Sequence, residues 1–153
     1  MDRFDYWILK RREGWIQSQI IKRPMNNHII KMLLVGSDSG SLGDFPRILE
    51  PYQNILVTSV DSGSKALDTI RSENINLVIA DEQLTDTTGV EFIEALVTVN
   101  PLINCALVSS MSAKEFHQET EGLGILTQLP VQFGKKEMED LITVLDKILD
   151  QTA

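Results

Sequence analysis

Five short apolar runs alternate with segments of helical periodicity, and this alternation constrains the fold more than any other feature of the sequence. The runs are rich in β-branched or aliphatic residues and are bounded by Gly, Asn, Asp or Pro, as buried strands are. We predict strands at Met32–Gly36, Ile55–Val60, Leu77–Ala80, Cys105–Ser110 and Gly124–Leu129. Apolar residues at three- and four-residue spacing predict helices at Phe45–Glu50, Lys65–Arg71, Val90–Val99, Lys114–Glu121 and Lys136–Leu149.

Near-continuous apolar strands separated by helices predict an α/β fold, a doubly wound parallel sheet with right-handed crossovers and helices on both faces. Ligands of such sheets bind beyond the carboxyl ends of the strands. We call this edge of the sheet the strand-end edge. We expect it to bring together the segments Gly36-Ser37-Asp38, Asp81, Ser109-Ser110 and Leu129-Pro130.

Several motifs in this order resemble the receiver domain of bacterial two-component response regulators. Asp81 closes the third predicted strand in "DEQLTDTTG", and a glycine follows eight residues later. "VSS" is similar to the family's fourth-strand ending, and "GLGILTQLP" is similar to its approach to the fifth strand. The resemblance covers about Lys31 to Leu149 and implies a flavodoxin-like (βα)5 fold with strand order 2-1-3-4-5.

The resemblance also implies roles for residues at the strand-end edge. Asp81 corresponds to the phospho-acceptor, and Asp38, Asp81 and the backbone carbonyl of Gln83 would be the ligands of a weakened magnesium site. Ser109 and its neighbour Ser110 would contact the phosphoryl group and report its presence. An Asp after a buried strand also commonly starts a turn by bonding nearby backbone N–H groups, so the residues alone leave both interpretations of Asp81 open.

Four positions depart from the family pattern. Gly36 and Ser37 stand where the family has its acidic pair, and the nearest carboxylate is one residue further on, at Asp38. Leu129 replaces the family's lysine, and Leu126 replaces its switch aromatic. We therefore expect weak magnesium binding and the loss of a charge-assisted phosphate contact, typically worth about 1.5–3 kcal/mol.

The charge distribution divides the chain into an N-terminal basic and aromatic extension, residues 1–30, and a receiver-like domain, residues 31–150. Residues 1–31 carry seven Lys or Arg and three acidic residues, so their net charge is +4, while the whole chain has −8 and the remainder −12. An acidic body disfavours nucleic acid as a partner. We expect the extension to be partly helical and to bind its own domain, a second copy or another partner, unless translation begins at Met25 or Met32. Three acidic residues within it argue against a membrane surface.

Other function classes find little support in the sequence. "GSDSGSLG" matches neither the dinucleotide nor the P-loop glycine spacing, and His28 and His117 are isolated. The single Cys105 forms no internal disulfide and has no metal-ligand spacing around it. The sequence has neither a membrane-length apolar run nor an export signal, so we expect a cytoplasmic protein without enzymatic activity.

Two functions remain. The first is a stand-alone receiver-like domain in a phosphorelay: a histidine kinase or phosphotransfer protein phosphorylates Asp81, and a downstream protein recognises the result. The second is a degenerate receiver that acts as a phosphorylation-independent interaction or dimerisation module. The retained Asp81 and Ser109 favour the first function, and the altered acidic pair and lysine favour the second.

Overall fold

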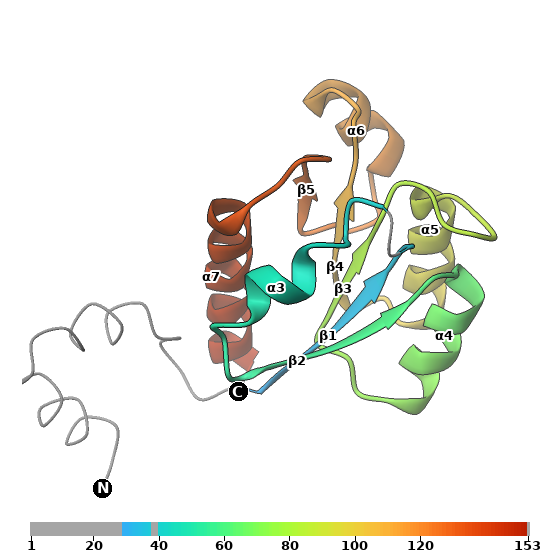
Figure 1. The fold of residues 1–153 in the computed structure, drawn as a ribbon. Helices are drawn as coiled ribbons and strands as arrows, with labels where there is room; N and C mark the ends of the chain where they lie inside the picture. The colour runs from blue at the N-terminus through green and yellow to red at the C-terminus, as the bar shows by residue number, and fades with distance from the viewer. Residues whose placement is uncertain (1–28, 38–39, 153) are drawn as a thin grey trace, which may run out of the picture.

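The computed structural model describes residues 29–37 and 40–152. It contains one parallel five-stranded sheet in the order β2-β1-β3-β4-β5 (Figure 1), so the predicted α/β fold and strand order are confirmed. The strands are β1 (Ile30–Val35), β2 (Ile55–Val60), β3 (Leu77–Ala80), β4 (Asn104–Val108) and β5 (Thr127–Leu129). The helices are α3 (Phe45–Leu49), α4 (Gly63–Ser72), α5 (Gly89–Val99), α6 (Ala113–Thr120) and α7 (Lys135–Thr152).

Helices cover both faces of the sheet, and each face has its own hydrophobic core. Helices α3 and α7 pack on one face, where Phe45 and Leu141 contact alternate β1 residues such as Met32. Helices α4 and α5 pack on the other face, where Phe92 joins Leu33 of β1. Because side chains alternate across a strand, the central strands must be apolar at every position. All four residues of β3 are accordingly buried.

Side-chain caps determine where three of the helices begin. Ser62, Thr88 and Ser112 each accept a hydrogen bond from the backbone N–H three residues later, at the starts of α4, α5 and α6. Such a bond satisfies one of the N–H groups that a helix leaves without an internal partner. These helices therefore begin one or two residues earlier than the apolar periodicity predicts.

Two predicted strands are longer than the observed ones. Strand β4 ends at Val108 rather than Ser110, because the Ser109 hydroxyl accepts a bond from the N–H of Met111 and turns the chain. Strand β5 begins at Thr127 rather than Gly124, whose φ of 69° lies in the left-handed region and is incompatible with a strand. Strand β1 begins at Ile30, two residues before the predicted start at Met32, because the N–H of Ile30 already bonds to the carbonyl of Asn54.

The predicted extension lies almost wholly outside the described residues, which begin at Ile29. Its partial helicity, and the boundary between residues 1–30 and 31–150, therefore stay predictions. No helix within 29–37 and 40–152 combines the length and apolar character needed to cross a bilayer.

Candidate functional site

Asp81 lies at the strand-end edge, one residue beyond β3. Its backbone N–H donates to the carbonyl of Val35 at 2.9 Å, which continues the pairing of β3 with the central strand β1. The residue is only 7 % exposed. The sequence therefore placed this carboxylate correctly at the edge, but the structure holds it beneath neighbouring backbone.

Both carboxylate oxygens of Asp81 accept hydrogen bonds from the backbone. Oδ1 accepts from the N–H of Glu82 at 2.8 Å, and Oδ2 accepts from the N–H of Ser41 at 3.2 Å. Gly40 also lies against this carboxylate, because a Cβ on Gly40 would come within 2.7 Å of Oδ2. The connection between β1 and α3 thus covers the carboxylate with backbone atoms.

The segment after Asp81 forms a tight hairpin that leads into α5. Gln83 pairs with Thr88 in an isolated antiparallel bridge, flanked by bonds from the N–H of Leu84 to the carbonyl of Thr87 and from the N–H of Gly89 to the carbonyl of Glu82. These two bonds use the neighbours of Gln83 and not its own carbonyl, the oxygen that the family resemblance assigns to magnesium.

The motif "DEQLTDTTG" ends in a glycine, Gly89, because the position has no room for a side chain. A Cβ at this position would collide with the backbone carbonyl oxygen of Asp81 and lie 2.6 Å from Cδ1 of Leu107. Helix α5 can therefore begin directly against β3 only because residue 89 has no side chain.

Ser109 and Ser110 follow β4 and are already engaged in hydrogen bonds. The Ser109 hydroxyl accepts from the N–H of Met111 at 3.1 Å. The N–H and hydroxyl of Ser110 both donate to Oε2 of Glu82, at 2.9 and 3.0 Å. The side chain of Gln128 donates to the carbonyls of Ser109 and Met111, at 3.3 and 2.8 Å. The turn after β4 is thus held from two sides.

The positions that depart from the family pattern serve packing in this structure. Leu129 is 3 % exposed and belongs to the core beneath α7, and Leu126 packs against the same core. Gly36 continues the sheet through a 2.9 Å bond from its N–H to the carbonyl of Val60, and Ser37 accepts at its backbone carbonyl from the N–H of Gly40. Asp38, the substitute carboxylate, lies outside the described residues.

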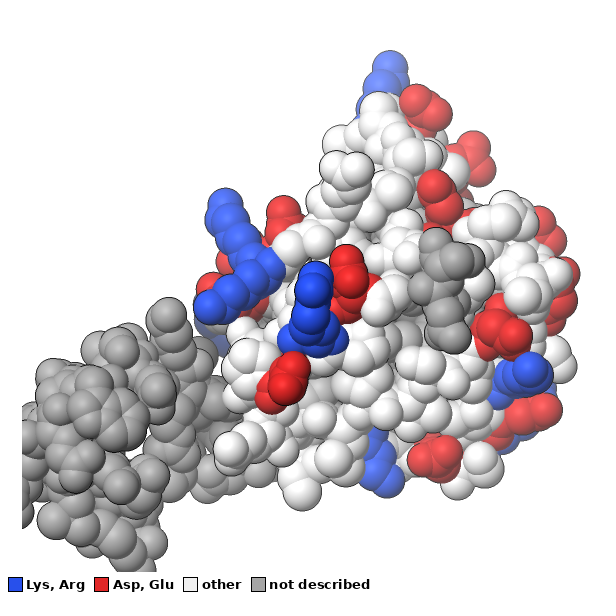
Figure 2. All heavy atoms as spheres, in the orientation of Figure 1, with Lys and Arg blue, Asp and Glu red and all other residues white. Residues whose placement is uncertain are grey.

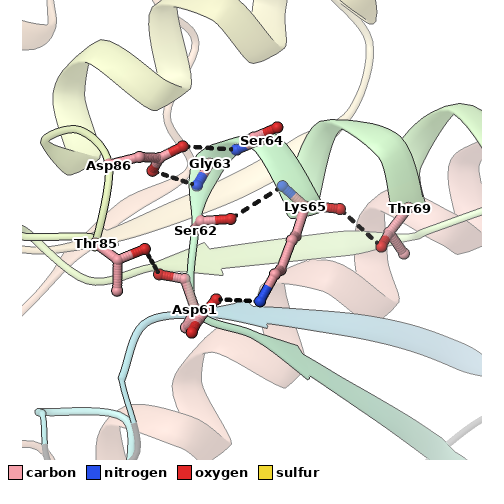
Figure 3. Close-up of polar contacts among 8 residues, drawn as sticks. All are labelled: Asp61, Ser62, Gly63, Ser64, Lys65, Thr69, Thr85 and Asp86. Atoms are coloured by element: carbon pink, nitrogen blue, oxygen red, sulfur yellow. Dashed lines mark hydrogen bonds and ion pairs between the residues drawn. The ribbon is translucent and has the colours of Figure 1, made fainter.

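A network that the sequence did not reveal joins the segment after β3 to the start of α4. Asp86 accepts bonds from the N–H groups of Gly63 and Ser64, at 2.8 and 3.1 Å (Figure 3). Both the N–H and hydroxyl of Thr85 donate to the carbonyl of Asp61. The Gly63 bond, followed by the Ser64 bond, lowers the pKa of the exposed Asp86 carboxyl below its ordinary value. Only the strand order could have indicated this network: β2 and β3 flank β1, so the loops that follow them face each other across β1.

The described residues supply only part of a magnesium site. Magnesium prefers an octahedral set of oxygen ligands that commonly includes one or two carboxylates. Here the Asp81 oxygens already accept backbone N–H groups, and neither Gly36 nor Ser37 offers a carboxylate. Within the part of the chain that the structure describes, no three His, Cys, Asp or Glu residues form a group able to hold a metal ion. Because Asp38 lies outside the described residues, the predicted ligand set is incomplete in the part of the chain that the structure describes.

The segment of the chain that contains β3, β4 and β5 is strongly acidic. Residues 72–134, which include β3, β4 and β5, carry one cation, Lys114, against nine acidic residues, so their net charge is 1 − 9 = −8. Figure 2 shows acidic side chains over the side of the molecule where α5 and α6 lie.

Comparison with known proteins identifies the family. A family model described as "response regulator receiver domain" matches residues 32–143, more than half of the chain. The chain belongs to this receiver domain family. Receiver domains are generally non-enzymatic signalling modules that typically bind magnesium at an acidic site and interact with kinases, phosphotransfer proteins and effectors. A search of curated protein sequences finds no match.

Solved receiver domains share the fold of this one at low sequence identity. The signal receiver domain of an HD domain-containing protein from Pseudomonas fluorescens Pf-5 superimposes with a TM-score of 0.71 at 16 % identity, covering 86 % of this chain and 96 % of its own. A CheY-like receiver domain protein from Methanospirillum hungatei JF-1 gives 0.69 at 21 %, covering 80 % and 98 %. The chemotaxis response regulator CheY4 of Vibrio cholerae gives 0.66 at 20 %, covering 76 % and 98 %.

Proposed function

We propose that this receiver domain signals through protein contact and does not require phosphorylation of Asp81. The observation that carries the proposal is the state of Asp81, a residue that is 7 % exposed and whose two carboxylate oxygens both accept bonds from backbone N–H groups. The bond from the N–H of Ser41 and the close approach of Gly40 to Oδ2 restrict the access of a phosphoryl donor to this carboxylate.

The surroundings of Asp81 also lack the positive charge that a phosphoryl group needs. Phosphoryl transfer relies on cations and hydrogen-bond donors placed where negative charge develops. The lysine position holds the buried Leu129, and the described residues do not complete a magnesium site.

A second candidate function is phosphorylation of Asp81 by a histidine kinase or phosphotransfer protein. It is supported by the position of Asp81 at the end of β3 and of Ser109 at the end of β4, on adjacent strands. In this case a downstream protein would distinguish the two states, since a switch acts only through differential affinity.

Acetyl phosphate separates the two candidates. The full chain and the Asp81→Asn variant are incubated with magnesium and acetyl phosphate, and intact-protein mass spectrometry follows under conditions that preserve an acyl phosphate. A receiver with the complete acidic pair and lysine is treated in parallel as the positive control. We expect no phosphate-sized mass gain on this protein. A gain on the parent that is absent from Asp81→Asn would refute the proposal and establish the second candidate.

Dimerisation is the simplest contact that a module of this kind can make. Sedimentation velocity measures the association state of the full chain directly, over a hundredfold concentration range and with or without acetyl phosphate. Our proposal predicts the same association state in both conditions and in Asp81→Asn. Association that appears only with the phosphoryl donor would argue for the second candidate.

A further inference from the structure

Three carboxylates lie within the six residues that follow β3, and each bonds to a different neighbouring loop. We call residues 81–86 the anchor segment. Asp81 bonds to the loop after β1, Glu82 to the loop after β4, and Asp86 to the first turn of α4, directly after the loop that follows β2. The three acids therefore point to three separate places and do not converge on one ligand.

The first two anchors lie on either side of β3. Oδ2 of Asp81 accepts from the N–H of Ser41, 40 residues earlier in the chain. Oε2 of Glu82 accepts from both the N–H and the hydroxyl of Ser110, 28 residues later. One pair of adjacent acids therefore holds two loops that follow different strands.

The third anchor reaches across β1. Asp86 bonds through its two oxygens to Gly63 and Ser64, the first residues of α4, and Figure 3 shows it beside the start of that helix. A carboxylate in this place also interacts favourably with the helix dipole. With Thr85 bonded to the carbonyl of Asp61, the anchor segment and the loop after β2 are joined at several points.

We propose that the anchor segment is a fixed brace that holds the loops after β1, β2 and β4 in one conformation. This inference rests on the proposed function and deepens it, because it gives the three acids a structural role at an edge that signals without phosphate. Bonds to ionised acceptors are stronger than neutral ones, so each carboxylate is suited to hold its loop. Each carboxylate acts at its own place, so removing one loosens the amides that it accepts from and leaves the other two anchors intact.

Residue-resolved amide hydrogen exchange, measured by NMR on the full chain, tests this inference. The variants are Asp81→Asn, Glu82→Ala and Asp86→Ala, and the matched control is Glu94→Ala, which removes an exposed acid of α5 whose side chain anchors no described loop. Asparagine is used at the buried position because it keeps the volume and replaces one acceptor oxygen with a donor.

We expect exchange to accelerate about tenfold at the amide that loses its acceptor. The affected amides are Ser41 or Glu82 in Asp81→Asn, Ser110 in Glu82→Ala, and Gly63 and Ser64 in Asp86→Ala. The other loops and the Glu94→Ala control should stay within about twofold of the parent.

Failure of any one variant to accelerate its own amide would overturn the inference, as would acceleration of all three loops in every variant. The amides of Leu33 and Val78, in the centre of the sheet, report global opening and distinguish it from local release. Because the measurement contains neither phosphoryl donor nor partner, it fails or succeeds independently of the acetyl phosphate experiment.

Discussion

Replacing Gly89 with alanine tests the close contact between α5 and β3. The added Cβ would meet the backbone carbonyl oxygen of Asp81, and this oxygen cannot rotate away as a side chain would. Overpacking of this kind costs about 1–3 kcal/mol. Alanine is favoured over glycine within helices by up to about 1 kcal/mol. That gain applies to helix interiors and is small at Gly89, the first residue of α5, so we expect a loss of about 1–3 kcal/mol in the free energy of unfolding.

Thermal and urea unfolding followed by circular dichroism measure this loss. For a chain of this size it corresponds to a fall in Tm of about 2–12 °C. The matched control is Gly134→Ala, where the nearest atom to the new Cβ, Oε2 of Glu137, is 3.8 Å away. The control should cost less than about 1 kcal/mol. If Gly89→Ala is as stable as the parent, α5 does not depend on this contact and our account of the glycine is wrong.

Three further predictions concern the core, a helix cap and pH. Leu129→Ala should lower the free energy of unfolding by about 2–5 kcal/mol, because the side chain is buried. In the same urea titration the exposed Val131→Ala should cost less than about 1 kcal/mol. Ser112→Ala removes the acceptor for the N–H of Glu115 and should lower the free energy of unfolding by about 1 kcal/mol. Ser112→Thr keeps a hydroxyl at this position and should retain most of that stability. The folded-state pKa of Asp86 is lowered, so its contribution to stability is present above the unfolded pKa and is lost as pH falls through the folded one. In urea unfolding measured from pH 6 to pH 3, the free energy of unfolding should therefore fall less steeply with pH in Asp86→Asn than in the parent. Parallel curves of the free energy of unfolding against pH would contradict this.

The sequence predicted the fold because the fold depends on patterns that are local. A four-residue run such as Leu77–Ala80, buried throughout, reads as a central strand, and the helical periods between such runs require crossovers. The errors fell at the ends of elements. There, single contacts decide the boundary, such as the Ser62 cap of α4 or the positive φ of Gly124.

The candidate site was only partly predictable for the same physical reason. Strand order places Asp81, Ser109 and Leu129 at one edge, and a family resemblance suggests their roles. Which N–H groups the carboxylates accept depends on the path of each loop backbone, and this path has no local signature in the sequence. Asp86 therefore had no assignment until the structure placed it at the start of α4.

The unequal pairing of the strands has a consequence for how the domain opens. Strand β1 pairs with β2 over six positions and with β3 over four, whereas β5 is joined to β4 at only three. Partial unfolding should therefore start with separation of β5, while β1 separates only when the whole domain unfolds. A protease acting on the native protein at low denaturant should accordingly cut first between α6 and α7, and cuts near β1 should appear only at denaturant concentrations that unfold the entire chain.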